Sequence, residues 1–141
     1  MSTRHTYPAV IGSAVLLGSV IAAAPAQAGG GDFTERTGSC SANASWVMKA
    51  KHDTGRIEME FSVETQRAGQ RWTVRVRDNG ALVFSGARRT NRISRSLSVD
   101  RMLTNRAGTD RFVARAINAR TGEVCRGRVA LAPAGSSGSS G

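Results

Sequence analysis

Apolar residues recur at every second position through most of this chain, a period typical of β-strands and not of helices. The clearest case is 57–64, where Ile57, Met59, Phe61 and Val63 alternate with polar residues. Strands are predicted over residues 42–50, 57–64, 71–77, 81–87, 94–99, 111–117 and 124–131. The pattern therefore predicts an all-β domain of about seven strands.

Turn motifs separate these strands at regular intervals. Asp53-Thr54-Gly55 and Asp78-Asn79-Gly80 are typical hairpin sequences, because Asn and Gly accept the left-handed backbone that tight hairpins need. Residues 102–110 form a polar connection. The strand at 94–99 is irregular, since Arg95 falls on the apolar face, so we expect it to begin only after Arg95.

The two ends of the chain differ in composition from its body. Residues 1–28 have a basic start, an apolar run over 9–24 and the small-residue site Ala26-Gln27-Ala28, which indicates a cleavable signal peptide. We expect 29–37 to be a flexible segment, 38–131 the folded domain and 132–141 a Gly/Ser-rich flexible tail. No later run is long enough for a transmembrane anchor, so the expected location is extracellular.

Two cysteines, Cys40 and Cys125, bracket the predicted domain. In an exported chain of this size such a pair favours a disulfide over free thiols. Closing a loop of about 86 residues should stabilise the fold by roughly 4–5 kcal/mol. A catalytic thiol is disfavoured, because His52 is the only histidine after the signal and its place beside a turn predicts a solvated side chain.

Residues 110–118, followed by Gly122, form a short motif. Asp110 precedes an aromatic residue, small residues alternate inward, and Asn118 and Gly122 mark a turn. This motif resembles the F strand and F–G turn of fibronectin type III and other immunoglobulin-like domains, with Phe112 in place of their usual tyrosine. The resemblance implies a β-sandwich closed by one disulfide, in which the third, sixth and seventh predicted strands share one sheet and the first, second and fifth the other.

A β-meander or small barrel is the alternative architecture, and it would place Glu60 opposite Arg75 and Glu58 opposite Arg77. The whole chain is also similar to small secreted all-β proteins of high-GC Gram-positive bacteria, which carry a signal peptide and one disulfide. That resemblance implies a compartment and a fold class, and it implies no activity.

The chain is strongly basic, with a net charge of +10 at pH 7, and 18 of its 20 basic residues are arginine. Such a chain is attracted to polyanions. In the sandwich arrangement one sheet would direct seven arginines outward, which makes them candidate anion-binding residues: Arg71, Arg75, Arg77, Arg111, Arg115, Arg126 and Arg128. The outward residues of the opposite sheet would roughly cancel in charge: Lys49, Lys51, Glu58, Glu60 and Glu64. The alternative is that the arginines only cover a solvated sheet.

A second basic cluster lies in and beside the connection between the fourth and fifth predicted strands. It consists of Arg88, Arg89, Arg92 and Arg95. Loops often carry recognition residues on a rigid scaffold, so this cluster is a second candidate site.

Enzymatic functions receive little support from the sequence. The one histidine after the predicted signal leaves no catalytic triad and no zinc cluster, and no cofactor motif is present. Dedicated nucleic-acid binding is disfavoured, because Trp46, Trp72, Phe61 and Phe112 fall on predicted core faces and not where bases could stack. The sequence predicts a secreted, non-enzymatic binding module for an anionic cell-envelope polymer; the alternative is a small-molecule carrier or protein inhibitor on an immunoglobulin-like scaffold.

Overall fold

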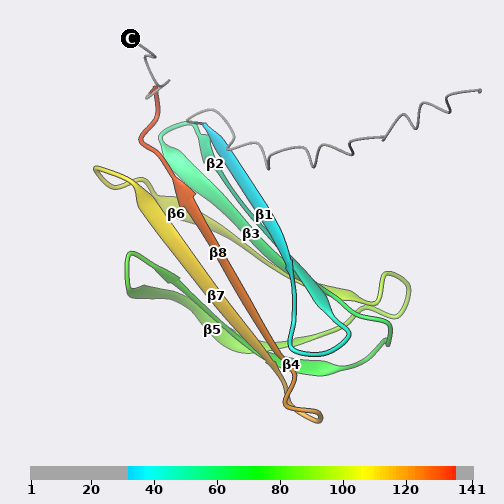
Figure 1. Ribbon diagram of the computed structural model, residues 1–141. Helices are drawn as coiled ribbons and strands as arrows, with labels where there is room; N and C mark the ends of the chain where they lie inside the picture. Colours follow the sequence, from blue (N-terminus) through cyan, green and yellow to red (C-terminus); the bar gives the residue numbers. More distant parts are fainter. Residues whose placement is uncertain (1–31, 136–141) are drawn as a thin grey trace, which may run out of the picture.

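The computed structural model describes residues 32–135, which form two four-stranded antiparallel sheets packed as a sandwich (Figure 1). The strands are β1 (Phe33–Ser39), β2 (Ser45–Asp53), β3 (Arg56–Glu64), β4 (Arg71–Asp78), β5 (Ala81–Arg89), β6 (Ser96–Thr104), β7 (Asp110–Asn118) and β8 (Val124–Leu131). One sheet has the order β1-β2-β3-β6 and the other β5-β4-β7-β8. The predicted signal peptide and residues 136–141 of the predicted tail lie outside the described residues.

The partition of strands between the sheets agrees with the immunoglobulin-like arrangement predicted from the sequence. The third, sixth and seventh predicted strands are β4, β7 and β8, and they share one sheet. The first, second and fifth are β2, β3 and β6, and they share the other. The meander is wrong, because Glu60 lies opposite Asp100 and Glu58 opposite Met102, both on β6. The sheets do not close into a barrel.

β1 is the strand that the sequence analysis missed, since it begins at Phe33 within the segment expected to be flexible. Its seven residues pair with β2 over their whole length, from Phe33 opposite Lys51 to Ser39 opposite Ser45. The strand has little apolar alternation because Thr34, Arg36 and Gly38 occupy the positions opposite the buried residues of β2. A Cβ atom at Gly38 would lie 2.6 Å from the Trp46 indole, so the absence of a side chain lets β1 close over that ring.

β6 is longer than predicted. It begins at Ser96, after Arg95 as expected, but it continues to Thr104 through residues assigned to a polar connection. Arg95 itself has a φ of +56°, a left-handed conformation that ends the preceding turn and explains the break in alternation. Backbone pairing with β3 over nine positions holds the extra residues in the sheet.

The two hairpin motifs fold as expected. Thr54 and Gly55 both have positive φ, as do Asn79 and Gly80, which is the backbone of the two-residue turns that match strand twist. β2 therefore pairs directly with β3, and β4 with β5. These two hairpins set the register that decides which side chains face outward.

The core lies between the sheets and includes all four aromatic residues predicted to be inside. Phe61, Trp72 and Phe112 are fully buried, and Trp46 is nearly so. β8 contacts β1 and β2 of the opposite sheet, so the sandwich is closed along that side. The Cys40–Cys125 disulfide, predicted from the sequence, joins the residue after β1 to β8 on the same side.

Candidate anion-binding surface

The seven candidate arginines all lie exposed on the outer surface of the β5-β4-β7-β8 sheet, which we call the arginine face: Arg71, Arg75, Arg77, Arg111, Arg115, Arg126 and Arg128. They alternate with buried residues along β4, β7 and β8. The expectation that one sheet would present them together on one side is confirmed.

Strand register arranges these arginines in rows across the sheet. Arg75 lies directly opposite Arg115, and Arg115 lies directly opposite Arg126. Neighbouring strands are about 4.8 Å apart, so three guanidinium groups originate within roughly 10 Å of backbone. In the next row Arg77 and Arg128 flank Val113, whose side chain is half exposed. A flat partner could therefore contact several cations and some apolar surface at once.

No acidic residue interrupts the arginine face. The only acidic residues of these four strands, Asp78 and Asp110, both lie on the inner side and are buried. Among residues 32–135, no guanidinium nitrogen of this face lies within 4.0 Å of a carboxylate oxygen, whereas both lysines of the other sheet do. Arg77 is held by a hydrogen bond of 3.0 Å from its Nη1 to the Gly80 carbonyl. The other guanidinium groups have unused N–H donors. Arginine can bind an oxyanion through two such donors at once.

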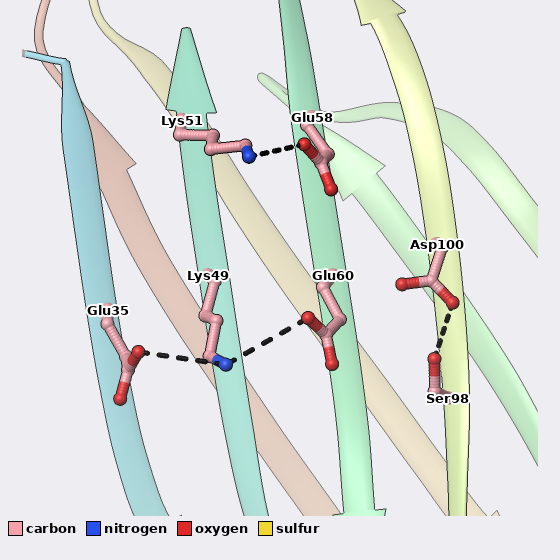
Figure 2. Close-up of polar contacts among 7 residues, drawn as sticks. All are labelled: Glu35, Lys49, Lys51, Glu58, Glu60, Ser98 and Asp100. Carbon is pink, nitrogen blue, oxygen red and sulfur yellow. Dashed lines mark hydrogen bonds and ion pairs between the residues drawn. The ribbon is translucent and has the colours of Figure 1, made fainter. Parts of the chain in front are cut away.

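On the outer surface of the other sheet, which we call the lysine–glutamate face, both lysines are paired with carboxylates (Figure 2). Lys51 Nζ lies 2.8 Å from Glu58, and Lys49 Nζ lies 3.9 Å from Glu35 and 4.0 Å from Glu60. Ser98 donates a hydrogen bond to Asp100 on β6, as Figure 2 also shows. The register of the β2–β3 hairpin places Lys49 opposite Glu60 and Lys51 opposite Glu58. The hydrogen bond and charge of Glu58 raise the pKa of Lys51.

The second predicted cluster is not a single site. Arg88 stacks over the Phe84 ring at 4.6 Å, and Arg101 of β6 covers the same ring at 4.8 Å. Arg89 faces the opposite side of β5 and lies directly across from Arg71 on β4, so it extends the arginine face. Arg92 and Arg95 lie exposed in the turn after β5. Alternation along β5 separates Arg88 from Arg89, and for that reason sequence proximity was a poor guide here.

Three arginines that the sequence analysis did not single out adjoin the arginine face. Arg36 of β1 lines a hollow together with Arg126 and Arg128 of β8. Arg67 and Arg120 line another hollow with Arg71 and Arg89. Arg36 was missed because β1 was missed. The other two lie in connections, where no alternation indicates which way a residue faces.

Two acidic residues are buried in this sheet, Asp78 at the end of β4 and Asp110 at the start of β7. Asp110 is 1% exposed, and neither of its carboxylate oxygens has a hydrogen-bond partner among the described residues; Asp78 Oδ1 likewise has none. Burial raises the pKa of Asp110, opposed by the charges of His52 and Arg106. Burial raises the pKa of Asp78 as well, and the charge of Asp110 adds to that effect.

His52 is not the solvated turn residue that was predicted. It lies in β2, its ring is part-buried, and its Nε2 lies 2.8 Å from the Ala132 carbonyl oxygen. Its Nδ1 lies 3.5 Å from Asn105 Nδ2. The described residues contain no group of three or more His, Cys, Asp or Glu side chains placed to hold a metal ion.

Comparison with known proteins gave no match to a family model, to a curated protein or to a solved structure. Within residues 32–135 there is no helix long and apolar enough to cross a membrane.

Proposed function

We propose that this is a secreted, non-enzymatic binding module that holds an anionic polymer of the cell envelope on its arginine face. The observation that carries the proposal is the Arg75–Arg115–Arg126 row, in which like charges occupy directly opposed positions on three paired strands. Like charges so placed destabilise a sheet. A bound polyanion would remove that repulsion, whereas a merely solvated surface gains nothing from the alignment.

Two further observations support this proposal. The lysine–glutamate face of the other sheet provides an internal comparison, because there each lysine lies opposite a glutamate of the neighbouring strand. The disulfide is consistent with an oxidising, extracellular environment. The signal peptide predicted over residues 1–28 is part of the same proposal.

The carrier or inhibitor alternative receives no such support. The space between the sheets is filled by buried side chains, with Phe61, Trp72 and Phe112 fully enclosed. The two surface hollows named above each have several arginines in their lining. A carrier of apolar molecules would need an apolar cavity.

The test is retention of purified, oxidised protein on immobilised envelope polymer and on a generic polyanion resin across a salt gradient. The variant Arg75→Ser/Arg115→Ser/Arg126→Ser removes the central row. The control Lys49→Ser/Lys51→Ser/Arg56→Ser removes three charges from the other sheet.

We expect the wild type and the control to remain on the envelope polymer at salt concentrations that release the row variant. The salt dependence of the row variant should correspond to about three fewer neutralised anionic groups. Equal elution of the two variants, or equal retention of the wild type on both matrices, would show that only net charge matters.

A further inference from the structure

The hollow at one end of the arginine sheet is formed by three segments that are distant in sequence. The connection 67–70 and the start of β4 form one wall, Arg89 at the end of β5 a second, and residues 118–121 of the β7–β8 turn the third. Its volume is about 530 Å³, within the size range of small-molecule sites. The hollow shares Arg71 and Arg89 with the edge of the arginine face, but unlike the open rows it has room for a compact ligand.

Four arginines line this hollow and no acidic residue does: Arg67, Arg71, Arg89 and Arg120. Arg71 and Arg89 are directly opposed across β4 and β5, which places two positive charges in adjacent positions. None of the four forms an ion pair within the described part of the chain. Glu123 lines an adjoining hollow that shares Arg67, Gln70 and Thr121 with this one. Its Oε1 accepts hydrogen bonds from the Ala42 and Ala44 amides at 3.1 and 2.7 Å. The hollow is therefore a concentration of uncompensated positive charge.

The walls of the hollow are held in place without a ligand. Thr90 is buried; its hydroxyl donates to the Arg67 carbonyl and accepts from the Gln70 amide, both at 2.8 Å. Arg89 Nη1 donates to the Gly69 carbonyl at 3.1 Å, which fixes that guanidinium at the hollow. On the third wall Asn118 Oδ1 accepts from the amides of Arg120 and Thr121. The backbone of the walls and the Arg89 guanidinium are therefore preorganised, and a ligand would have to order the exposed side chains of Arg67, Arg71 and Arg120.

We propose that this hollow binds a phosphate dianion, as a phosphate monoester or as free phosphate. A phosphate monoester carries three terminal oxygens and close to two negative charges, so it can accept paired hydrogen bonds from several guanidinium groups at once. A carboxylate has two oxygens and a single charge, so it would leave three of the four positive charges uncompensated, against two for a phosphate dianion. The remaining volume, bordered by the Ala68 and Ala119 positions, accommodates an organic group of about the size of a sugar.

The inference does not depend on polymer binding by the arginine face, and one experiment separates the two. Isothermal titration of the oxidised protein would use inorganic phosphate, glucose 6-phosphate, glucose and glucuronate. The hollow variant is Arg67→Ser/Arg120→Ser, which changes two exposed connection residues outside the arginine face. The matched control is Arg115→Ser/Arg126→Ser, which removes the same charge from the arginine face.

We expect one or both phosphates to bind, with glucose and glucuronate weaker by at least about tenfold, the loss that follows from one missing charged hydrogen bond. The hollow variant should lose at least about tenfold in phosphate affinity, and the control should stay close to the wild type. Tighter binding of glucose 6-phosphate identifies an esterified ligand, and equal binding identifies free phosphate; both results support the site.

No phosphate binding at millimolar concentration, or equal losses in the two variants, would overturn the phosphate site. Polymer retention measured on the same proteins tests the other proposal separately. The hollow variant should keep the polymer and the control should release it.

Discussion

The two sheets of this sandwich place their acidic side chains on opposite sides. In the β1-β2-β3-β6 sheet, Glu35, Glu58 and Glu60 face outward and pair with lysines (Figure 2). In the β5-β4-β7-β8 sheet, Asp78 and Asp110 face inward and are buried, which leaves the outer surface with arginines and no acid. The comparison teaches that strand register, and not arginine content alone, concentrates the charge of this protein on one face.

The largest loss of stability should follow removal of the disulfide that joins the two sheets along their closed side. Replacing Cys40 and Cys125 with Ser should lower the free energy of unfolding by about 4 kcal/mol, because the unfolded chain regains the freedom of a long loop. Urea unfolding of the oxidised wild type and the variant measures this difference. A loss below about 1 kcal/mol would mean that edge contacts of β8 with β1 and β2 hold the sheets together without the bond.

Packing between the sheets depends on Gly127 of β8. A Cβ atom there would lie 2.9 Å from Phe61 and 3.1 Å from Trp46, both in the opposite sheet. Gly127→Val should destabilise the fold by about 1–3 kcal/mol, because the rings must move to admit the side chain. Gly86→Val is the comparison on β5 of the same sheet. A Cβ atom there would lie 3.2 Å from the Phe84 ring, and β5 has few contacts with β6 of the opposite sheet. Equal losses in urea unfolding would show that the two sides are equally tight.

The inward acids of the arginine sheet should give the protein an unusual pH dependence. Burial raises the pKa of Asp78 and of Asp110 in the folded state. The folded protein then binds more protons than the unfolded chain, so the stabilisation is complete below the unfolded pKa of about 3.9 and is lost as pH rises through the folded values. These two groups should make the domain more stable in mild acid than at neutral pH.

The variant Asp78→Asn/Asp110→Asn keeps the shape of both side chains and removes their titration. Its free energy of unfolding should vary less between pH 4.5 and pH 7 than that of the wild type, as followed by urea unfolding across that range. An unchanged pH profile would mean that other groups dominate the titration.

Much of the fold was predictable because its signals are local. The alternation in β3, β4, β7 and β8 and the Asn79-Gly80 turn indicate strands and hairpins directly. The arginine face followed once the sheet partition was known, because outward positions are then set by period two. β1 could not be predicted in this way, since Thr34, Arg36 and Gly38 occupy its inward positions and the Trp46 ring of β2 packs against Gly38.

The remaining site residues depend on contacts between distant segments. Arg67 and Arg120 lie in connections that meet only in the folded chain. His52 and the buried acids take their environment from residues far along the sequence, as shown by the contact of His52 with Ala132. No local pattern reports such contacts.

The most direct test of the difference between the faces reverses one charge on each. Arg115 lies between Arg75 and Arg126, so Arg115→Glu replaces two like-charged cross-strand pairs with two opposite ones. It should raise the free energy of unfolding by up to about 1 kcal/mol at low salt. Lys49 lies between Glu35 and Glu60, so Lys49→Glu should lower it by a similar amount.

Because both variants remove two units of positive charge, net charge alone predicts the same change in stability and the same loss of polymer retention. Register predicts opposite stability changes, which shrink as salt screens them, and a loss of retention confined to Arg115→Glu. Urea unfolding at low and high salt and retention on the envelope polymer measure both. A variant that gains stability while losing its ligand would identify the Arg75–Arg115–Arg126 row as an arrangement that is unfavourable for folding, and binding would then be the reason for its presence.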